Sequence, residues 1–265
     1  MIYASYFTGT ETTKKIVTTI AQTLDPNYID DDFSSLNRRQ TPLTYAPGDV
    51  VIFGVPVIAG RVPNLLLKYL DTIEGNGAFA VPIVLYGNRN FDDSLIELRD
   101  ILEKGQLKTI AAGAFVGEHS FSKTLGKGRP DADDMEIARL FGRRIAKILQ
   151  EGSYGNTPVL VDGTPYPYRG YYQPRDRKEN PIDIRKVKPL TNAQCDDCKL
   201  CAEICPLGSI DFEQVSNISG ICMKCCACVK RCPKGAKYYD DPGYLYHQQE
   251  LEEIYQRRGN IHLYW

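Results

Sequence analysis

The sequence predicts an α/β protein, in which a doubly wound parallel sheet of five strands is followed by a small cysteine-rich α+β module. Two observations support this prediction. Apolar strand-like runs alternate with helical patterns over residues 1–150, and all nine cysteines fall between Cys195 and Cys232. Strands that alternate with helices imply a parallel sheet covered on both faces. A chain of 265 residues is long enough for one large or two smaller domains.

The expected elements follow from the periodicity of apolar residues. The predicted strands are Ile2–Phe7, Asp49–Phe53, Val81–Tyr86 and Thr109–Phe115, with a weaker one near Asn27–Asp31. The predicted helices are Thr12–Thr23, Pro63–Thr72, Asp92–Lys104 and Asp133–Gln150, and a later one at Tyr244–Arg258. Five strands in about 150 residues match a flavodoxin-like sheet, which binds its ligand at the carboxyl ends of the strands.

Composition restricts the partners and the compartment. The formal net charge is −1, so no broad field favours nucleic acid or an anionic membrane. The sequence has no basic start with an apolar export signal and no apolar run of about 18 residues. We therefore expect a cytoplasmic protein without a membrane span, and its oligomeric state stays open.

The cysteines form one spacing pattern that occurs twice. Each copy reads C-x2-C-x2-C-x3-C followed by proline, and the eight residues are Cys195, Cys198, Cys201, Cys205, Cys222, Cys225, Cys228 and Cys232. Three closely spaced cysteines wrap three corners of an iron–sulfur cube, and the fourth ligates the other cluster. This predicts two [4Fe–4S] clusters, one on Cys195, Cys198, Cys201 and Cys232, the other on Cys222, Cys225, Cys228 and Cys205. Structural zinc, which prefers paired C-x2-C knuckles, fits the spacing poorly.

Cys226 is the ninth cysteine and directly follows Cys225. It is either a spare thiol that packs as a small apolar residue or an alternative, oxidation-sensitive ligand. The first interpretation is favoured, because only adjacency to Cys225 supports the second.

Three loops at consecutive strand ends suggest a binding site. The first, Thr8-Gly9-Thr10-Glu11-Thr12-Thr13, opens a helix with hydroxyl groups that either cradle a phosphate or act as ordinary caps. The others are residues 54–63 and 86–91, which separately read as common turns. No G-x-G-x-x-G follows a strand and no P-loop motif is present, so no nicotinamide or nucleoside triphosphate site is expected.

With these motifs, residues 1–242 resemble the flavodoxin–ferredoxin fusion proteins of anaerobic microbes. The resemblance implies FMN in the first module, with its phosphate held by Thr8, Gly9, Thr10, Thr12 and Thr13. It implies a flavin ring flanked by Val57, Ile58 and Ala59, with Gly87, Asn88 and Phe91 as backbone contacts and aromatic partner. Two positions depart from the family pattern: Glu11 stands where glycine is frequent, and Ile58 where an aromatic is frequent.

The expected domains are an FMN-binding domain (1–150), a Tyr/Pro-rich connector (151–190), a two-cluster domain (191–242) and a helical tail (243–265). The connector either packs along both modules or forms a surface loop with a few buried rings. His119 lies after a strand end, where it is either a structural histidine or a proton-transfer group at the flavin edge.

These cofactors predict electron transfer. An iron–sulfur cluster passes one electron at a time, whereas FMN handles one or two, and the protein sets their distance and orientation. We expect a carrier between redox partner proteins, with no catalytic side chain identified. The alternatives are an FMN-dependent reductase of a small acceptor such as a quinone, and an empty first domain that supports the cluster module. Clusters on exposed loops are sensitive to oxygen and suit an anaerobic host.

Overall fold

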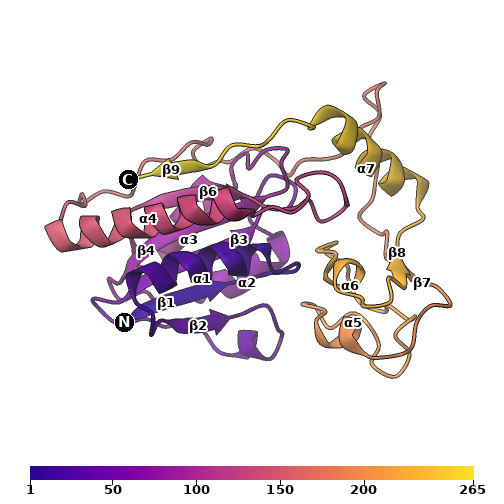
Figure 1. Cartoon of the computed structure of the whole chain (residues 1–265), viewed down its shortest axis with the longest axis horizontal. Coiled ribbons are helices and arrows are strands. Elements are labelled where there is room, and N and C mark those ends of the chain that lie inside the picture. Colours follow the sequence, from indigo (N-terminus) through magenta and orange to yellow (C-terminus); the bar gives the residue numbers. More distant parts are fainter.

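The computed structural model describes all 265 residues, and its larger part is a sheet with helices on both faces (Figure 1). The main elements are β1 (Ile2–Tyr6), α1 (Thr12–Leu24), β2 (Ile29–Asp32), β3 (Val50–Pro56), β4 (Phe79–Tyr86), α3 (Ser94–Lys104), β6 (Ala112–Val116) and α4 (Ala132–Glu151). The short elements of this part are η1 (Arg38–Gln40), η2 (Asn64–Leu66), α2 (Leu67–Leu70) and β5 (Lys108–Thr109).

The order of the five main parallel strands is β2-β1-β3-β4-β6. This is the flavodoxin-like order of a doubly wound sheet, and its switch point lies between β1 and β3. The prediction of five strands is incomplete, because the sheet has seven. β5 adds two residues beside β4, and β9 (His262–Tyr264) runs antiparallel to β6 at the edge.

The sheet separates two hydrophobic clusters. One contains Ile16, Ile20, Phe141 and Ile145 and lies beneath α1 and α4. The other packs α3 and the short helices against the opposite face. Because both faces are covered, β3 and β4 are almost continuously buried, as their apolar sequences require. None of the helices has both the length and the hydropathy that a membrane span needs.

Two predicted elements differ in the structure. The expected helix Pro63–Thr72 is shorter in the structure, as η2 and one turn of α2 that end at Leu70. Four residues later, Glu74 exchanges backbone hydrogen bonds with Leu43 and Tyr45. The expected strand Thr109–Phe115 splits, since β5 pairs with the start of β4 and β6 with its end.

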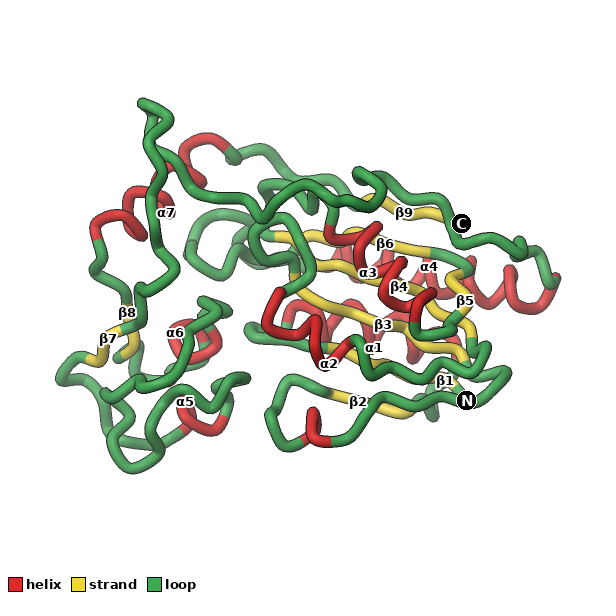
Figure 2. Tube along the Cα trace, turned by 180° about the vertical axis from the view of Figure 1, so that it is seen from behind, coloured by secondary structure: helices red, strands yellow, loops and turns green.

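The cysteine-rich module lies beyond the carboxyl ends of the parallel strands (Figures 1 and 2). It contains α5 (Leu200–Glu203), α6 (Ala227–Lys230) and the two-residue strands β7 (Leu190–Thr191) and β8 (Lys237–Tyr238), which pair antiparallel. After α7 (Pro242–Ile254) the chain returns to the first domain as β9. The module is therefore attached to the flavodoxin-like domain at both of its ends.

The connector packs along its neighbours. The Tyr171 hydroxyl donates to the Val62 carbonyl (3.0 Å), and Arg177 forms ion pairs with Glu250 and Glu253 of α7. Arg169 binds the fully buried carboxylate of Asp93 and holds its pKa well below the ordinary value. Tyr166 stays exposed. These contacts favour the packed alternative for the connector.

Candidate functional site

The loop between β1 and α1 presents unused hydrogen-bond donors. The Thr8 N–H donates to Ser34 Oγ (2.8 Å), but the backbone N–H groups of residues 9–14 have no acceptor within the chain. The hydroxyls of Thr8 and Thr13 are buried without a partner. Buried polar groups are normally paired, so two orphan hydroxyls beside a free helix N-terminus fit a phosphate group.

The loops after β3 and β4 reach the same edge, as expected for parallel strands. Ile58 and Arg61 close a tight turn by two backbone bonds, with Ala59 at φ 51°. Gly87 faces His119, and a Cβ on Gly87 would lie 2.4 Å from the imidazole Cδ2. Only glycine permits this approach of Gly87 to His119. Because β3 and β4 are parallel, the residues predicted to flank a flavin ring lie at one edge of the sheet.

The side chains of Asn88 and Phe91 are directed elsewhere. Asn88 is buried and binds the C-terminal tail, with its Nδ2 donating to the carbonyls of Tyr255 and Arg257 (2.7 Å each). The Phe91 ring is 6% exposed and packs against Tyr86 and His262. The expected aromatic partner is thus part of the core. Nothing in the local sequence indicated that Asn88 would bind a segment about 170 residues away.

His119 is held by its neighbours. Its Nδ1 accepts the Phe121 N–H (3.1 Å), which leaves the proton of the neutral ring on Nε2. Burial lowers the pKa of His119 to about 3, and the charges of His247, Lys230 and Arg89 act in the same direction. His119 is therefore neutral near pH 7, with a bonded Nδ1, which favours the structural interpretation.

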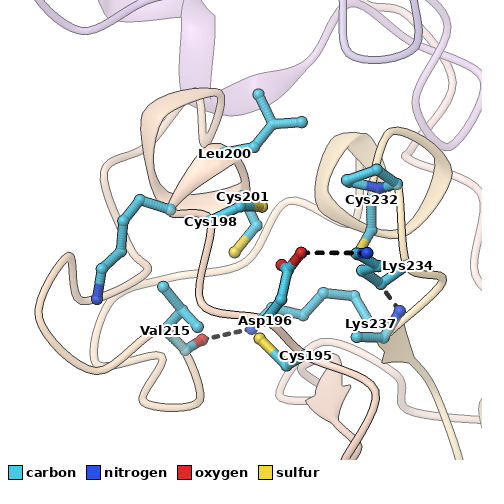
Figure 3. A pocket seen from close by; sticks show the side chains of 12 residues that line it. Cys195, Asp196, Cys198, Leu200, Cys201, Val215, Cys232, Lys234 and Lys237 are labelled. Carbon is cyan, nitrogen blue, oxygen red and sulfur yellow. Dashed lines mark hydrogen bonds and ion pairs between the residues drawn. The ribbon is translucent and has the colours of Figure 1, made fainter.

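The cysteines divide into two pockets in the way that their spacing predicts. One is lined by Cys195, Cys198, Cys201 and Cys232 (Figure 3), the other by Cys205, Cys222, Cys225, Cys226 and Cys228. All nine are free thiols. In this structure no three or more His, Cys, Asp or Glu side chains close around a point as a single metal ion requires.

Backbone N–H groups point at three of these sulfurs. Cys195, Cys205 and Cys232 accept from the N–H groups of Asp197, Ser209 and Ala236 at 3.3–3.4 Å. Such bonds orient cluster ligands and tune the potential, so the donor set suits clusters. The two pockets differ in depth. The Cys198 side chain is exposed. The Cys225 thiol lies deeper, and its burial raises its pKa to about 12. We call the pocket of Cys198 the outer pocket and that of Cys225 the inner pocket.

Cys226 corresponds to Lys199 in the other copy of the motif. Both have positive φ (58° and 63°) and both precede a short helix. The Cys226 Sγ lies 3.6 Å from the Tyr244 hydroxyl of α7, and its thiol is buried. These contacts favour the packing role, although the residue also lines the inner pocket.

The inner pocket lies against the β1–α1 loop. A Cβ on Gly9 would lie 3.0 Å from Cys225 Cβ and 3.1 Å from its carbonyl oxygen. On the same loop, Glu11 pairs with Arg231 of the cysteine module, with Nη1 and Oε1 2.9 Å apart. The positive φ of Glu11 (68°) explains why glycine suits this position, and the ion pair explains the carboxylate.

Further contacts hold the module at both sides of that loop. Lys230 forms an ion pair with Glu118 and donates to the Ser122 carbonyl. Arg39 donates to the carbonyl of Pro206, which follows the first cysteine motif. Sequence analysis missed all these basic residues, because their partners lie more than a hundred positions away.

No family model matches the sequence, and no curated protein matches it. Solved structures similar to the chain include a flavodoxin from the domain Archaea (12% identity, TM-score 0.39, covering 56% of this chain and 97% of that one). A Streptococcus pneumonia TIGR4 flavodoxin is 12% identical with a TM-score of 0.38, and the match covers 55% of this chain and 97% of that one. A flavodoxin, WrbA-like protein from Agrobacterium tumefaciens is 13% identical with a TM-score of 0.36, and the match covers 57% of this chain and 96% of that one. The flavodoxin-like fold assigned to the first domain rests on its strand order.

Proposed function

We propose that this chain transfers electrons between FMN in its flavodoxin-like domain, two [4Fe–4S] clusters and redox partner proteins. The observation that carries the proposal is the contact of Gly9 with Cys225. It joins the predicted phosphate loop to a predicted cluster ligand. A module that only shared a chain with the first domain would have no need to place this cysteine there.

Each cofactor has a residue set in this proposal. The loop N–H groups and the hydroxyls of Thr8 and Thr13 bind the phosphate, and the loops at Val57–Ala59 and Gly87 contact the ring. Cys195, Cys198, Cys201 and Cys232 hold one cluster, and Cys222, Cys225, Cys228 and Cys205 the other. FMN would supply one- or two-electron chemistry and the clusters one-electron chemistry.

The two cysteine pockets differ in their exposure, and this difference suggests a route for the electrons. Cys198 of the outer pocket is exposed, so a partner protein can approach that end. The inner pocket faces the first domain, and the ion pairs Glu11–Arg231 and Glu118–Lys230 hold it there. Electrons would therefore enter or leave through the outer cluster and pass the inner one next to FMN.

One observation favours the alternative, an FMN-dependent reductase of a small acceptor. A groove of about 570 Å³ lies beside the loop after β4 and is lined by Arg89, Arg169 and Arg257 among others. This volume suits a small molecule. Reduction of quinones at saturable rates well above those of free FMN would support this reading, and fast exchange only with ferredoxin-type proteins would favour the carrier.

The decisive experiment is cofactor analysis of anaerobically purified protein. About one FMN with eight iron and eight sulfide per chain is expected. In a reductive titration followed by absorbance, electrons should distribute between the flavin and the clusters, so that both cofactors are reduced in equilibrium with each other. Iron and sulfide without FMN, even after FMN is added, would make the first domain a scaffold and refute the proposal.

A further inference from the structure

Glu11 is an unusual residue for a phosphate-binding loop. It stands at the N-cap position of the 13-residue helix α1 with positive φ and no capping hydrogen bond from its side chain, next to backbone N–H groups that have no acceptor. A carboxylate in this position repels an incoming anion. In the structure this charge is met by a guanidinium from the other domain, that of Arg231.

Arg231 has binding capacity left over. A guanidinium offers five N–H donors. Beyond the contact with Glu11, the Arg231 side chain makes no other ion pair and no hydrogen bond within the chain. The two side chains are 36% and 39% exposed, and a pair this exposed adds little stability. The geometry thus brings a cation with free donors to the mouth of the loop, where stabilising the fold is a minor role.

We propose that Arg231 binds the flavin phosphate across the domain boundary, so that the cysteine module completes the phosphate site. This inference rests on the proposed function, since it requires FMN in the β1–α1 loop. Arginine suits the role because its planar fork binds phosphate oxygens in pairs.

A consequence is reciprocal coupling between the two domains. If the phosphate binds groups on both, FMN favours the docked module, and docking favours FMN by the same factor. The close approach of Gly9 to Cys225 supports this coupling, since it places the module directly against the loop.

The test compares FMN with riboflavin, which has the same ring but no phosphate. Each flavin is titrated into the full chain, with clusters loaded and flavin removed, and fluorescence quenching gives Kd. Arg231→Ala should weaken FMN by about tenfold and leave riboflavin unchanged. Arg231→Lys should lie between. Lys234→Ala is the matched control, because this lysine of the same module pairs with Asp196 and should leave both affinities unchanged.

Glu11→Gln separates phosphate binding from a simple ion pair. If Arg231 binds phosphate, Glu11→Gln binds FMN at least as tightly as the wild type, since it loses the repelling charge. If Glu11→Gln instead weakens FMN as much as Arg231→Ala does, the arginine acts only through the ion pair and the inference is refuted.

Two further outcomes overturn it. One is an unchanged FMN affinity in Arg231→Ala, and the other is an equal loss for FMN and riboflavin. Iron content is measured for every variant, and Arg231→Gln, which keeps a polar side chain but removes the charge, replaces Arg231→Ala if the alanine variant loses iron. Failure of wild-type protein to bind FMN would refute the proposed function itself, which distinguishes the two failures.

Discussion

Asn88 offers a sharp test of how the C-terminal tail is held. Its side chain makes three hydrogen bonds to tail backbone: Nδ2 to the carbonyls of Tyr255 and Arg257 (2.7 Å each), and Oδ1 from the N–H of Gly259 (2.8 Å). Asn88 is 3% exposed and Gly259 is buried. The replacement Asn88→Ala removes all three bonds at once.

The magnitude follows from these bonds. A buried intramolecular hydrogen bond contributes about 1 kcal/mol net, and an orphaned buried donor costs more. Asn88→Ala should therefore lower the free energy of unfolding by about 3 kcal/mol. It should also free the tail, because the same residue ties it beside β4, close to the place where β9 joins the sheet.

The assay is urea unfolding followed by circular dichroism, with limited proteolysis of the tail, both without FMN. Asn90→Ala is the matched control, since Asn90 is exposed and its side chain accepts one bond, from the Asp92 N–H, so it should change stability by less than about 1 kcal/mol. The reasoning would be refuted if Asn88→Ala were as stable as the wild type without FMN and lost stability relative to it only when FMN is present. Asn88 would then act on the flavin.

Three other predictions follow from single contacts. Cys226→Ala should retain eight iron per chain and an unchanged cluster spectrum, because the thiol packs on Tyr244; loss of four iron would make it a ligand. Gly54→Ala should destabilise the fold by about 2 kcal/mol in urea unfolding, since its Cβ would lie 2.3 Å from Val17 Cγ2, and adding Val17→Ala should recover part of the loss. Burial lowers the pKa of His119 to about 3 and of His247 to about 4. As the pH falls, these histidines bind protons at a higher pH in the unfolded chain than in the folded one. The free energy of unfolding is therefore unaffected above about pH 6.5 and decreases toward pH 4. At pH 5 the expected loss is about 2 kcal/mol for each histidine, and a flat unfolding profile between pH 7 and 5 would contradict it.

Much of the first domain could be predicted from local pattern. The runs at β1, β3 and β4 are apolar enough to be buried on both faces, and α1 and α4 carry apolar residues at helical spacing. These signals involve residues close in sequence, so no distant contact is needed to read them. The helix expected at Pro63–Thr72 is present but shorter, ending at Leu70, and the chain then reaches Glu74, which bonds to residues 43–45, a distant contact that no local pattern marks.

The candidate site shows the same division. The grouping of eight cysteines into two sets and the loop Thr8–Thr13 could be read from spacing and residue type, because ligand geometry and helix capping are local requirements. The role of the loop at residues 86–91 could not be predicted from local sequence. Phe91 packs against His262 of β9, and Asn88 binds the tail before β9.

The sequence by itself predicted the main strands and helices of the first domain and a division of the cysteines into two interleaved sets, since each depends on periodicity or short spacing. Only the tertiary structure decided that the chain returns to the sheet as β9, that the cysteine module covers the loop edge, and that Glu11 meets Arg231. The physical reason is the same in each case. These contacts join residues that are far apart in the chain, and single charged or amide side chains form them without any periodic pattern that would mark them in advance.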